Sequence, residues 1–294
     1  MLSTVPKFLS LDDVQHWALD SLVREGEVSA PRGLATRELL AAGFCLENPR
    51  ARKIANSSRG WSEALAIGEF AWHVSGATEL APIAYYAPRW REFSEDGEHI
   101  RGSCYGSRIF GKPSNGPSQW DRLIELLRSD MATRRAILTV MQSPEDTLSV
   151  TSVDVPCVSS CQFLVRGHKL HAIMKMRSND VIWGLPYDVF LFTMIQEMLA
   201  CELKLELGSY FHIAGSFHLY ERHIGLAKSI VAEGAGQWEA MAPMNTTDEL
   251  EPFLRFEQDL RTEGSSRVEL SAYWSSLAAP LWRHAKRVRD RLSV

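Results

Sequence analysis

The segment CQFLVRGHKLHAIMKMRSNDVIWGLPYDVFLFTMIQEML, residues 161–199, decides the fold of this chain. Its first part alternates apolar and polar side chains on both sides of Gly167-His168, which predicts a β-hairpin over 161–178. Pro186 then opens a strongly apolar run over 189–199, in which large side chains recur at helical spacing. We therefore expect a hairpin followed by a helix at the centre of the core.

The flanking sequence adds elements of both kinds, without a linker, a repeat or a low-complexity run. This pattern predicts a single α+β domain over residues 1–294. One helix is of particular interest, because it places Glu69 in apolar surroundings and ends at Gly76. The expected elements are helices at 61–76 and 119–130, long functional loops at 85–116, strands at 134–142 and 209–223, and a charged helical region beyond about residue 230.

Composition excludes several classes of function. With 294 residues and 45% hydrophobic content the chain can bury one large core, and a net charge of -4 with a pI near 6.2 argues against nucleic acid or an anionic membrane as partner. The N-terminus lacks a basic segment followed by an apolar run, and no stretch of eighteen apolar residues occurs, so we expect a cytoplasmic protein. The five cysteines are expected to be reduced and not to bind a metal; they are Cys45, Cys104, Cys157, Cys161 and Cys201.

Cys157 is the first of four features that carry side chains suited to chemistry. It directly follows Pro156, and although a free cysteine is more often inert than nucleophilic, a nearby arginine would favour its thiolate. The second feature is the passage 177–188, RSNDVIWGLPYD, in which Asp180 and Asp188 lie eight residues apart. Taken alone, this passage favours a capped turn before a helix over a functional pair of carboxyl groups.

The third and fourth features are a pair on a strand and a pair of cations. His218 and Tyr220 share one face of the predicted strand, where such a pair is commonly structural but can also bind a sugar hydroxyl. Arg134-Arg135 is either a solvated surface pair or a bidentate clamp for phosphate.

The order and spacing of these features resemble the thymidylate synthase family over roughly residues 60–225. The matching motifs are a double arginine, Pro-Cys, Gln-Phe, Arg-Ser-x-Asp, Gly-x-Pro and His-x-Tyr, with Glu69 and Tyr105-Gly106 upstream. The resemblance implies a thymidylate synthase-like fold, with a mixed β-sheet at a dimer interface and a central buried helix. It also implies an obligate homodimer, because Arg134 and Arg135 match arginines that reach across a two-fold axis into the partner's site.

The resemblance further implies covalent catalysis, in which Cys157 attacks C6 of a pyrimidine nucleoside monophosphate. C5 then takes up a one-carbon unit from 5,10-methylenetetrahydrofolate, a cosubstrate. Glu69 matches the general acid/base, a role that a carboxyl pKa raised by burial would suit. The other catalytic matches are Tyr105 and Asp188; the substrate-binding matches are Arg32, Arg134, Arg135, Gln162, Arg177, Ser178, Asp188, His218 and Tyr220; and the folate-binding matches are Asp180, Trp90, Trp183 and Tyr187.

Asp188 departs from the family, which has asparagine at this position. An asparagine amide can donate to the uracil carbonyl, whereas a carboxyl group can accept from the exocyclic amine of cytosine and, with a proton, pair with the ring nitrogen. Val158 replaces the histidine that normally follows the nucleophile and belongs to the polar network near the uracil oxygen. Both changes indicate the branch that resembles cytidylate and deoxycytidylate hydroxymethylases, in which water captures the one-carbon unit and tetrahydrofolate is released.

Two departures concern the late sequence. The chain ends in RHAKRVRDRLSV, residues 283–294, where the family has an apolar tail that excludes water, so we hypothesise a site that admits water. The family's late sugar-binding tyrosine motif is not recognisable, which leaves both CMP and dCMP as substrates. Arginine outnumbers lysine, which favours a bacterial nucleoside-antibiotic pathway acting on CMP. The alternatives are a thymidylate synthase or uridylate hydroxymethylase acting on dUMP or UMP, and a non-catalytic nucleotide-binding homodimer.

Overall fold

A computed structural model describes residues 5–114 and 116–292, so the first four residues of the N-terminal segment and the last two of the C-terminal segment lie outside it. The strands are β1 Lys7–Phe8, β2 Glu27–Ser29, β3 Thr36–Leu46, β4 Ile137–Thr139, β5 Val158–Arg166, β6 Lys169–Asp180 and β7 Glu206–Tyr220. The α-helices are α1 Leu11–Glu25, α2 Glu63–Val74, α3 Leu80–Tyr86, α4 Tyr105–Ile109, α5 Gln119–Ser129, α6 Glu145–Leu148, α7 Leu185–Glu202, α8 Ile224–Glu233, α9 Leu250–Glu263 and α10 Ala272–Leu292. The 3₁₀-helices are η1 Pro31–Gly33, η2 Pro88–Phe93 and η3 Glu221–His223.

The strands of the described residues form one mixed sheet in the order β1-β3-β7-β6-β5-β4, with β2 beside β3. The predicted hairpin is confirmed as β5 and β6, which pair antiparallel up to Arg166 opposite Lys169. Strand β7 runs parallel to β6, so the chain must cross back between them, and α7 is that crossover. The expected α+β class and the mixed sheet are therefore confirmed.

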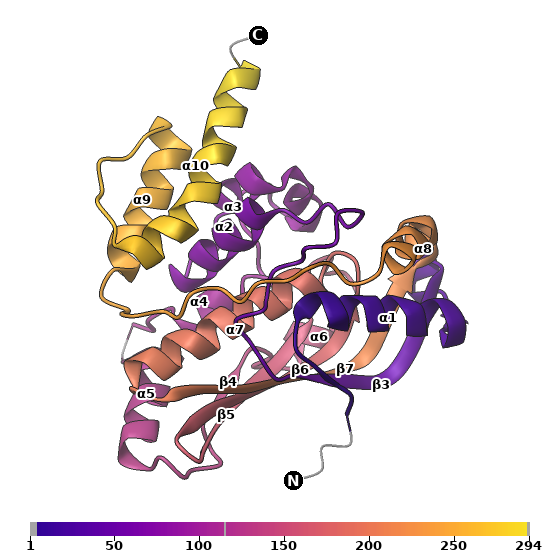
Figure 1. The fold of residues 1–294 in the computed structure, drawn as a ribbon, viewed down its shortest axis with the longest axis horizontal. Helices are drawn as coiled ribbons and strands as arrows, with labels where there is room; N and C mark the ends of the chain where they lie inside the picture. The colour runs from indigo at the N-terminus through magenta and orange to yellow at the C-terminus, as the bar shows by residue number, and fades with distance from the viewer. Residues whose placement is uncertain (1–4, 115, 293–294) are drawn as a thin grey trace.

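Helix α7 is the central buried helix that the sequence predicts. Its residues from Leu185 to Ala200 are mostly apolar and buried on every side, so other elements must surround the helix. The side chain of Gln196 ties it to the sheet, because Nε2 donates to the carbonyl oxygens of Leu170 at 2.9 Å and Gly208 at 3.1 Å. Figure 1 shows α7 lying across the sheet, with α2, α3, α9 and α10 stacked above it.

The opposite face of the sheet carries apolar side chains in contact with solvent. Figure 1 shows α1 and α7 on the same side of the sheet, and no labelled helix covers the other side within the described part of the chain. Strand pairing places Ile137, Gln162, Ile173 and Phe211 in one row on this face, and Ile213 lies two residues further along β7. Ile137 and Ile213 are 44% and 41% exposed. We call this surface the open sheet face.

Two local expectations need correction. The long loops expected at 85–116 contain η2 and α4, since Pro88 and the turn before Tyr105 each start a short helical segment. The helix expected at 61–76 ends earlier, at Val74, with Ser75 as its cap; Gly76 follows in the left-handed region at φ +72°. The helical pattern expected beyond about residue 230 is confirmed by α9 and α10, and residues 283–292 of the basic C-terminal segment form the end of α10. In the described ranges no helix is long and apolar enough to cross a membrane.

Candidate active site

Cys157 lies immediately before β5, where the loop from α6 enters the sheet. Arg177 of β6 holds this loop: its Nε donates to the Pro156 carbonyl at 2.8 Å, and its Nη2 donates to the Val155 carbonyl at 2.9 Å and lies 3.7 Å from Sγ of Cys157. Burial raises the pKa of the Cys157 thiol to about 11, although the charge of Arg177 acts in the opposite direction. The expected arginine is therefore present, but without substrate the effect of burial on the thiol pKa is larger than that of the Arg177 charge.

Asp154 joins the nucleophile loop to a second loop, residues 101–103. Its buried carboxylate accepts from the backbone N–H groups of Arg101, Gly102 and Ser103 at 2.7–3.2 Å, and from the Ser103 hydroxyl at 2.6 Å. Gly102 is required here, because a Cβ atom would come 2.1 Å from the Asp154 carbonyl oxygen. The second loop leads directly into Tyr105, so Asp154 fixes the position of α4 relative to Cys157.

Tyr105 is buried and Glu69 largely enclosed, and both Glu69 and Cys157 are close enough to Tyr105 for their charges to act on it. Glu69 is on α2, and burial raises the pKa of its carboxyl group to about 8, as the role of general acid/base requires. Tyr105 stacks on His73 of α2, with ring centroids 5.3 Å apart and an interplanar angle of 4°. The pKa of Tyr105 is raised by its burial and by the charges of Cys157 and Asp188, so the structure brings these groups into one cluster.

Asp188 occupies the first turn of α7, where its backbone N–H donates to the Gly184 carbonyl at 2.9 Å. Its carboxyl group is buried, and Oδ2 accepts from Nδ2 of Asn179 at 2.8 Å. A side chain at Gly184 would crowd this pair, since a Cβ atom there would come 3.0 Å from Nδ2 of Asn179 and 3.2 Å from Oδ2 of Asp188. Burial, and next the neighbouring Glu69, hold the pKa of Asp188 well above its usual range.

Two of the four predicted folate ligands, Asp180 and Trp183, lie at the turn between β6 and α7. Asp180 closes β6 and accepts from the Ile182 N–H at 2.9 Å, while the Trp183 indole remains 37% exposed. Two guanidinium groups flank that indole, Arg59 at 5.2 Å and Arg89 at 4.8 Å from the ring centroid. An exposed flat ring beside a carboxylate acceptor fits a fused aromatic ring that bears amino groups.

The two remaining folate candidates lie deeper. Tyr187 is buried, stacks on Trp61 and accepts from the Ser62 N–H at 3.2 Å. Trp90 belongs to η2 and contacts Trp72, with ring centroids 5.5 Å apart. Tyr187 thus packs in the main core, and Trp90 packs against a smaller cluster around Trp72.

The predicted sugar and phosphate ligands of this chain gather on β6, β7 and η1. Ser178 Oγ lies 3.5 Å from Nδ1 of His218, and the His218 and Tyr220 rings meet edge to face with centroids 5.2 Å apart. Arg32 has a φ of 54°, a sparsely populated conformation for a residue other than glycine. Burial raises the pKa of the Cys157 thiol, and the charge of Arg32 acts against this effect, although less strongly than the charge of Arg177.

Arg134, Arg135 and Gln162 lie apart from this cluster, beside β4 at the edge of the sheet. The two arginine side chains are exposed, and Nε2 of Gln162 donates to the Arg134 carbonyl at 2.9 Å. Gln162 belongs to the row that forms the open sheet face. Within one chain, these three predicted residues therefore lie close to each other and next to the open sheet face, and not beside Cys157.

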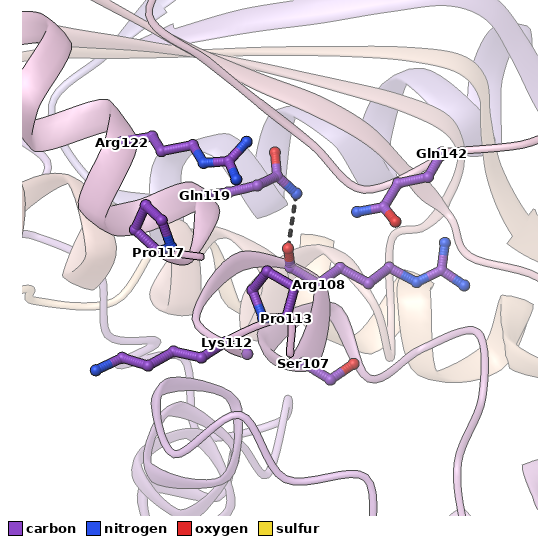
Figure 2. Close-up of a pocket in the computed structure, with 9 residues that line it drawn as sticks. Ser107, Arg108, Lys112, Pro113, Pro117, Gln119, Arg122 and Gln142 are labelled. Carbon is purple, nitrogen blue, oxygen red and sulfur yellow. Dashed lines mark hydrogen bonds between the residues drawn. The ribbon is translucent and has the colours of Figure 1, made fainter. Parts of the chain in front are cut away.

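A separate hollow of about 400 Å³ opens between α4 and α5 (Figure 2). Figure 2 shows Gln119 and Arg122 of α5 facing Lys112 and Arg108 across it, and Gln119 Nε2 donates to the Arg108 carbonyl at 2.6 Å. The Arg108 guanidinium is already paired with Asp146 at 2.8 Å. None of the residues lining this hollow belongs to the predicted site, so we assign it no part in the chemistry.

Sequence reasoning missed several residues that shape the site. Asn179 is detectable from strand alternation, since it faces inward between Ser178 and Asp180. His73 lies four residues after Glu69, a spacing that puts both on one face of α2. Arg59 gives no signal in the sequence, because only the tertiary fold brings it over Trp183.

The sequence is similar to a group of known proteins. A family model described as thymidylate synthase matches residues 55–259. The chain is 28% identical over 211 residues to a protein named deoxyuridylate hydroxymethyltransferase from Bacillus phage SP01, covering 69% of this chain and 55% of that protein's length. It is 28% identical over 197 residues to a thymidylate synthase of Bacillus mojavensis, covering 64% and 68% respectively, and 35% identical over 142 residues to one of Bacillus subtilis subsp. natto, covering 46% and 48%.

Proposed function

Because the chain belongs to the thymidylate synthase family, we propose that it is a folate-dependent C5-hydroxymethyltransferase of pyrimidine nucleotides that acts on CMP or dCMP. The observation that carries this proposal is the Asn179–Asp188 hydrogen bond in a buried site. The activity, its substrates and its homodimeric state are all part of the proposal. A bacterial nucleoside-antibiotic pathway is the setting that the arginine-rich composition favours.

Asp188 is suited to recognise cytosine because its two carboxyl oxygens are unequal. The N–H donated by Asn179 holds Oδ2 as an acceptor, so the proton favoured by burial belongs on Oδ1. Oδ2 then accepts from the exocyclic amine of cytosine, and Oδ1–H donates to the ring nitrogen. Uracil presents the reverse pattern at these two positions, and a mismatched base would leave buried polar groups unpaired.

The chemistry begins at Cys157, whose thiolate adds to C6 of the base. The positive charges of Arg177 and Arg32 would stabilise the negative charges of the thiolate and of the bound phosphate at this end of the site. Methylenetetrahydrofolate supplies the one-carbon unit when bound. A C5–CH₂ bond forms, the C5 proton leaves, tetrahydrofolate departs, water adds to the carbon, and Cys157 is expelled as the ring double bond returns. Glu69 handles the protons of these steps, which its pKa near 8 permits in both directions.

A second candidate is a uridylate or deoxyuridylate enzyme, and the name of the phage SP01 relative favours it. A protonated carboxyl group at position 188 can donate as well as accept, so it could serve uracil if the proton moved to Oδ2. The hydrogen bond from Asn179 opposes that arrangement.

Tritium release from C5-labelled CMP, dCMP, UMP and dUMP separates these functions. Each nucleotide is incubated with methylenetetrahydrofolate and the products are identified by mass. We expect release from a cytosine nucleotide together with a gain of one CH₂O. Release from uracil nucleotides alone, with a gain of CH₂, would establish a divergent thymidylate synthase instead.

The open sheet face supports a homodimer in which Arg134 and Arg135 bind the partner's substrate phosphate. Exposed apolar side chains on a sheet are stabilised by a second copy, and the arginine pair lies at the edge of the same face. Mixing a Cys157→Ser variant with an Arg134→Ala/Arg135→Ala variant should restore about a quarter of the activity, because one site in four then has both an intact nucleophile and intact arginines. No recovery after subunit exchange would show that the arginines act within their own chain.

A further inference from the structure

His73 lies next to the proposed general acid/base, and the proposed mechanism does not use it. It is on α2 four residues after Glu69, it is 1% exposed, and its Nε2 lies 3.8 Å from Oε1 of Glu69. Nε2 is buried without a hydrogen-bond partner among the described residues. A buried ring nitrogen without a partner is costly, so its presence beside a functional carboxyl group calls for a physical explanation.

The tautomer of His73 is set by its other ring nitrogen. The backbone N–H of Gly106 donates to Nδ1 at 3.1 Å, so Nδ1 must carry a lone pair. Burial lowers the pKa of His73 to about 3, which keeps the ring neutral at physiological pH. The single ring proton therefore resides on Nε2, and Nε2–H is a donor on the Glu69 side of the ring.

The surroundings hold the ring rigidly in this orientation. Tyr105 stacks on it nearly parallel, at 4°. Gly106 is the only residue that permits the close approach of its N–H, because a Cβ atom there would come 1.8 Å from the His73 carbonyl oxygen. A donor held in this way is preorganised for a charge that appears in front of it.

We propose that His73 is a positioning residue for Glu69, and that Nε2–H closes the 3.8 Å separation to donate a hydrogen bond to the Glu69 carboxylate when that group ionises. This rests on the proposed function only for the role of Glu69 as acid/base. The other groups close enough to act on Glu69 are Tyr105 from α4 and Tyr187 and Asp188 from α7. The charge of Asp188 opposes the ionisation of Glu69, whereas the N–H donor of His73 favours it.

The test measures the titration of Glu69 directly, in the full-length protein without substrates. Glutamate is labelled with ¹³C at the carboxyl carbon, and the Glu69→Gln variant identifies the signal. His73→Asn keeps an acceptor for the Gly106 N–H but is too short to donate to Glu69, whereas His73→Gln places an amide N–H near the position of Nε2. We expect His73→Asn to raise the Glu69 midpoint by about one pH unit, and His73→Gln to restore most of the wild-type value.

The pH dependence of kcat should move with that midpoint in the same two variants. An unchanged Glu69 midpoint in folded His73→Asn, even with a lowered melting temperature, would overturn the proposal and leave His73 a packing residue. A ¹⁵N-histidine spectrum of the wild-type protein with the proton on Nδ1 would overturn it without any variant. Because the titration needs no turnover, its outcome does not depend on whether cytosine nucleotides prove to be substrates.

Discussion

The Asp188→Asn substitution should reverse the preference between cytosine and uracil. Oδ2 of Asp188 accepts from Asn179 at 2.8 Å and faces the exocyclic group of the base, so uracil is served when the new amide places its NH₂ group there and Asn179 turns its own amide oxygen, buried without a partner among the described residues, to accept from it. In that arrangement the NH₂ group of residue 188 donates to the uracil carbonyl and its carbonyl oxygen accepts from the ring N–H, whereas the amine of cytosine is met donor to donor.

The size of the change follows from burial. Asp188 is 8% exposed, so water cannot relieve the donor pair, and an unsatisfied buried donor costs about 1–3 kcal/mol. Uracil gains a hydrogen bond of about 1 kcal/mol. Together these give about 3 kcal/mol, or roughly a 150-fold change in the ratio of kcat/KM for the two bases.

The assay is tritium release from matched CMP and UMP, and from dCMP and dUMP, at several concentrations. Asp180→Asn is the control, because it makes the same chemical change eight residues upstream and should slow both bases alike. If the folded Asp188→Asn protein kept the wild-type ratio within threefold, the hydrogen-bond argument for cytosine would be wrong.

Three further outcomes are expected. Cys157→Ser should abolish turnover while isothermal titration still detects nucleotide binding; loss of binding as well would point to a structural role. Glu69→Gln should flatten the pH dependence of stability. The Glu69 carboxyl has a pKa of about 8 in the folded protein against 4.5, so its protonated form stabilises the wild-type fold fully below pH 4.5, and this effect is lost as the pH rises through 8. The unfolding free energy of the variant relative to the wild type should therefore increase between pH 4.5 and 8, by at most roughly 5 kcal/mol in urea melts, and a difference that does not change with pH would contradict this. Gly106→Ala should destabilise by about 3 kcal/mol through contact with His73, whereas Gly225→Ala in α8, with open space around its Cβ, should stabilise by about 0.5–1 kcal/mol; equal urea midpoints would refute the clash.

The sequence by itself determined the central elements and the family. Apolar alternation around Gly167-His168 and the apolar run after Pro186 have few alternative solutions, because a one-residue slip would turn every core side chain to solvent. The motifs from Arg134 to His223 predicted the thymidylate synthase family, which the match over residues 55–259 confirms. The roles assigned to the individual site residues remain predictions.

Only the tertiary structure decided which groups face each other. Asn179 meets Asp188, and His73 presents one nitrogen to Gly106 and the other to Glu69, through distances that depend on how α2, α4 and α7 pack. The raised pKa values of Glu69 and Cys157 likewise arise from burial, which the whole core creates. Local sequence patterns encode periodicity and turns, whereas contacts between distant segments and their electrostatics emerge when the core closes around them.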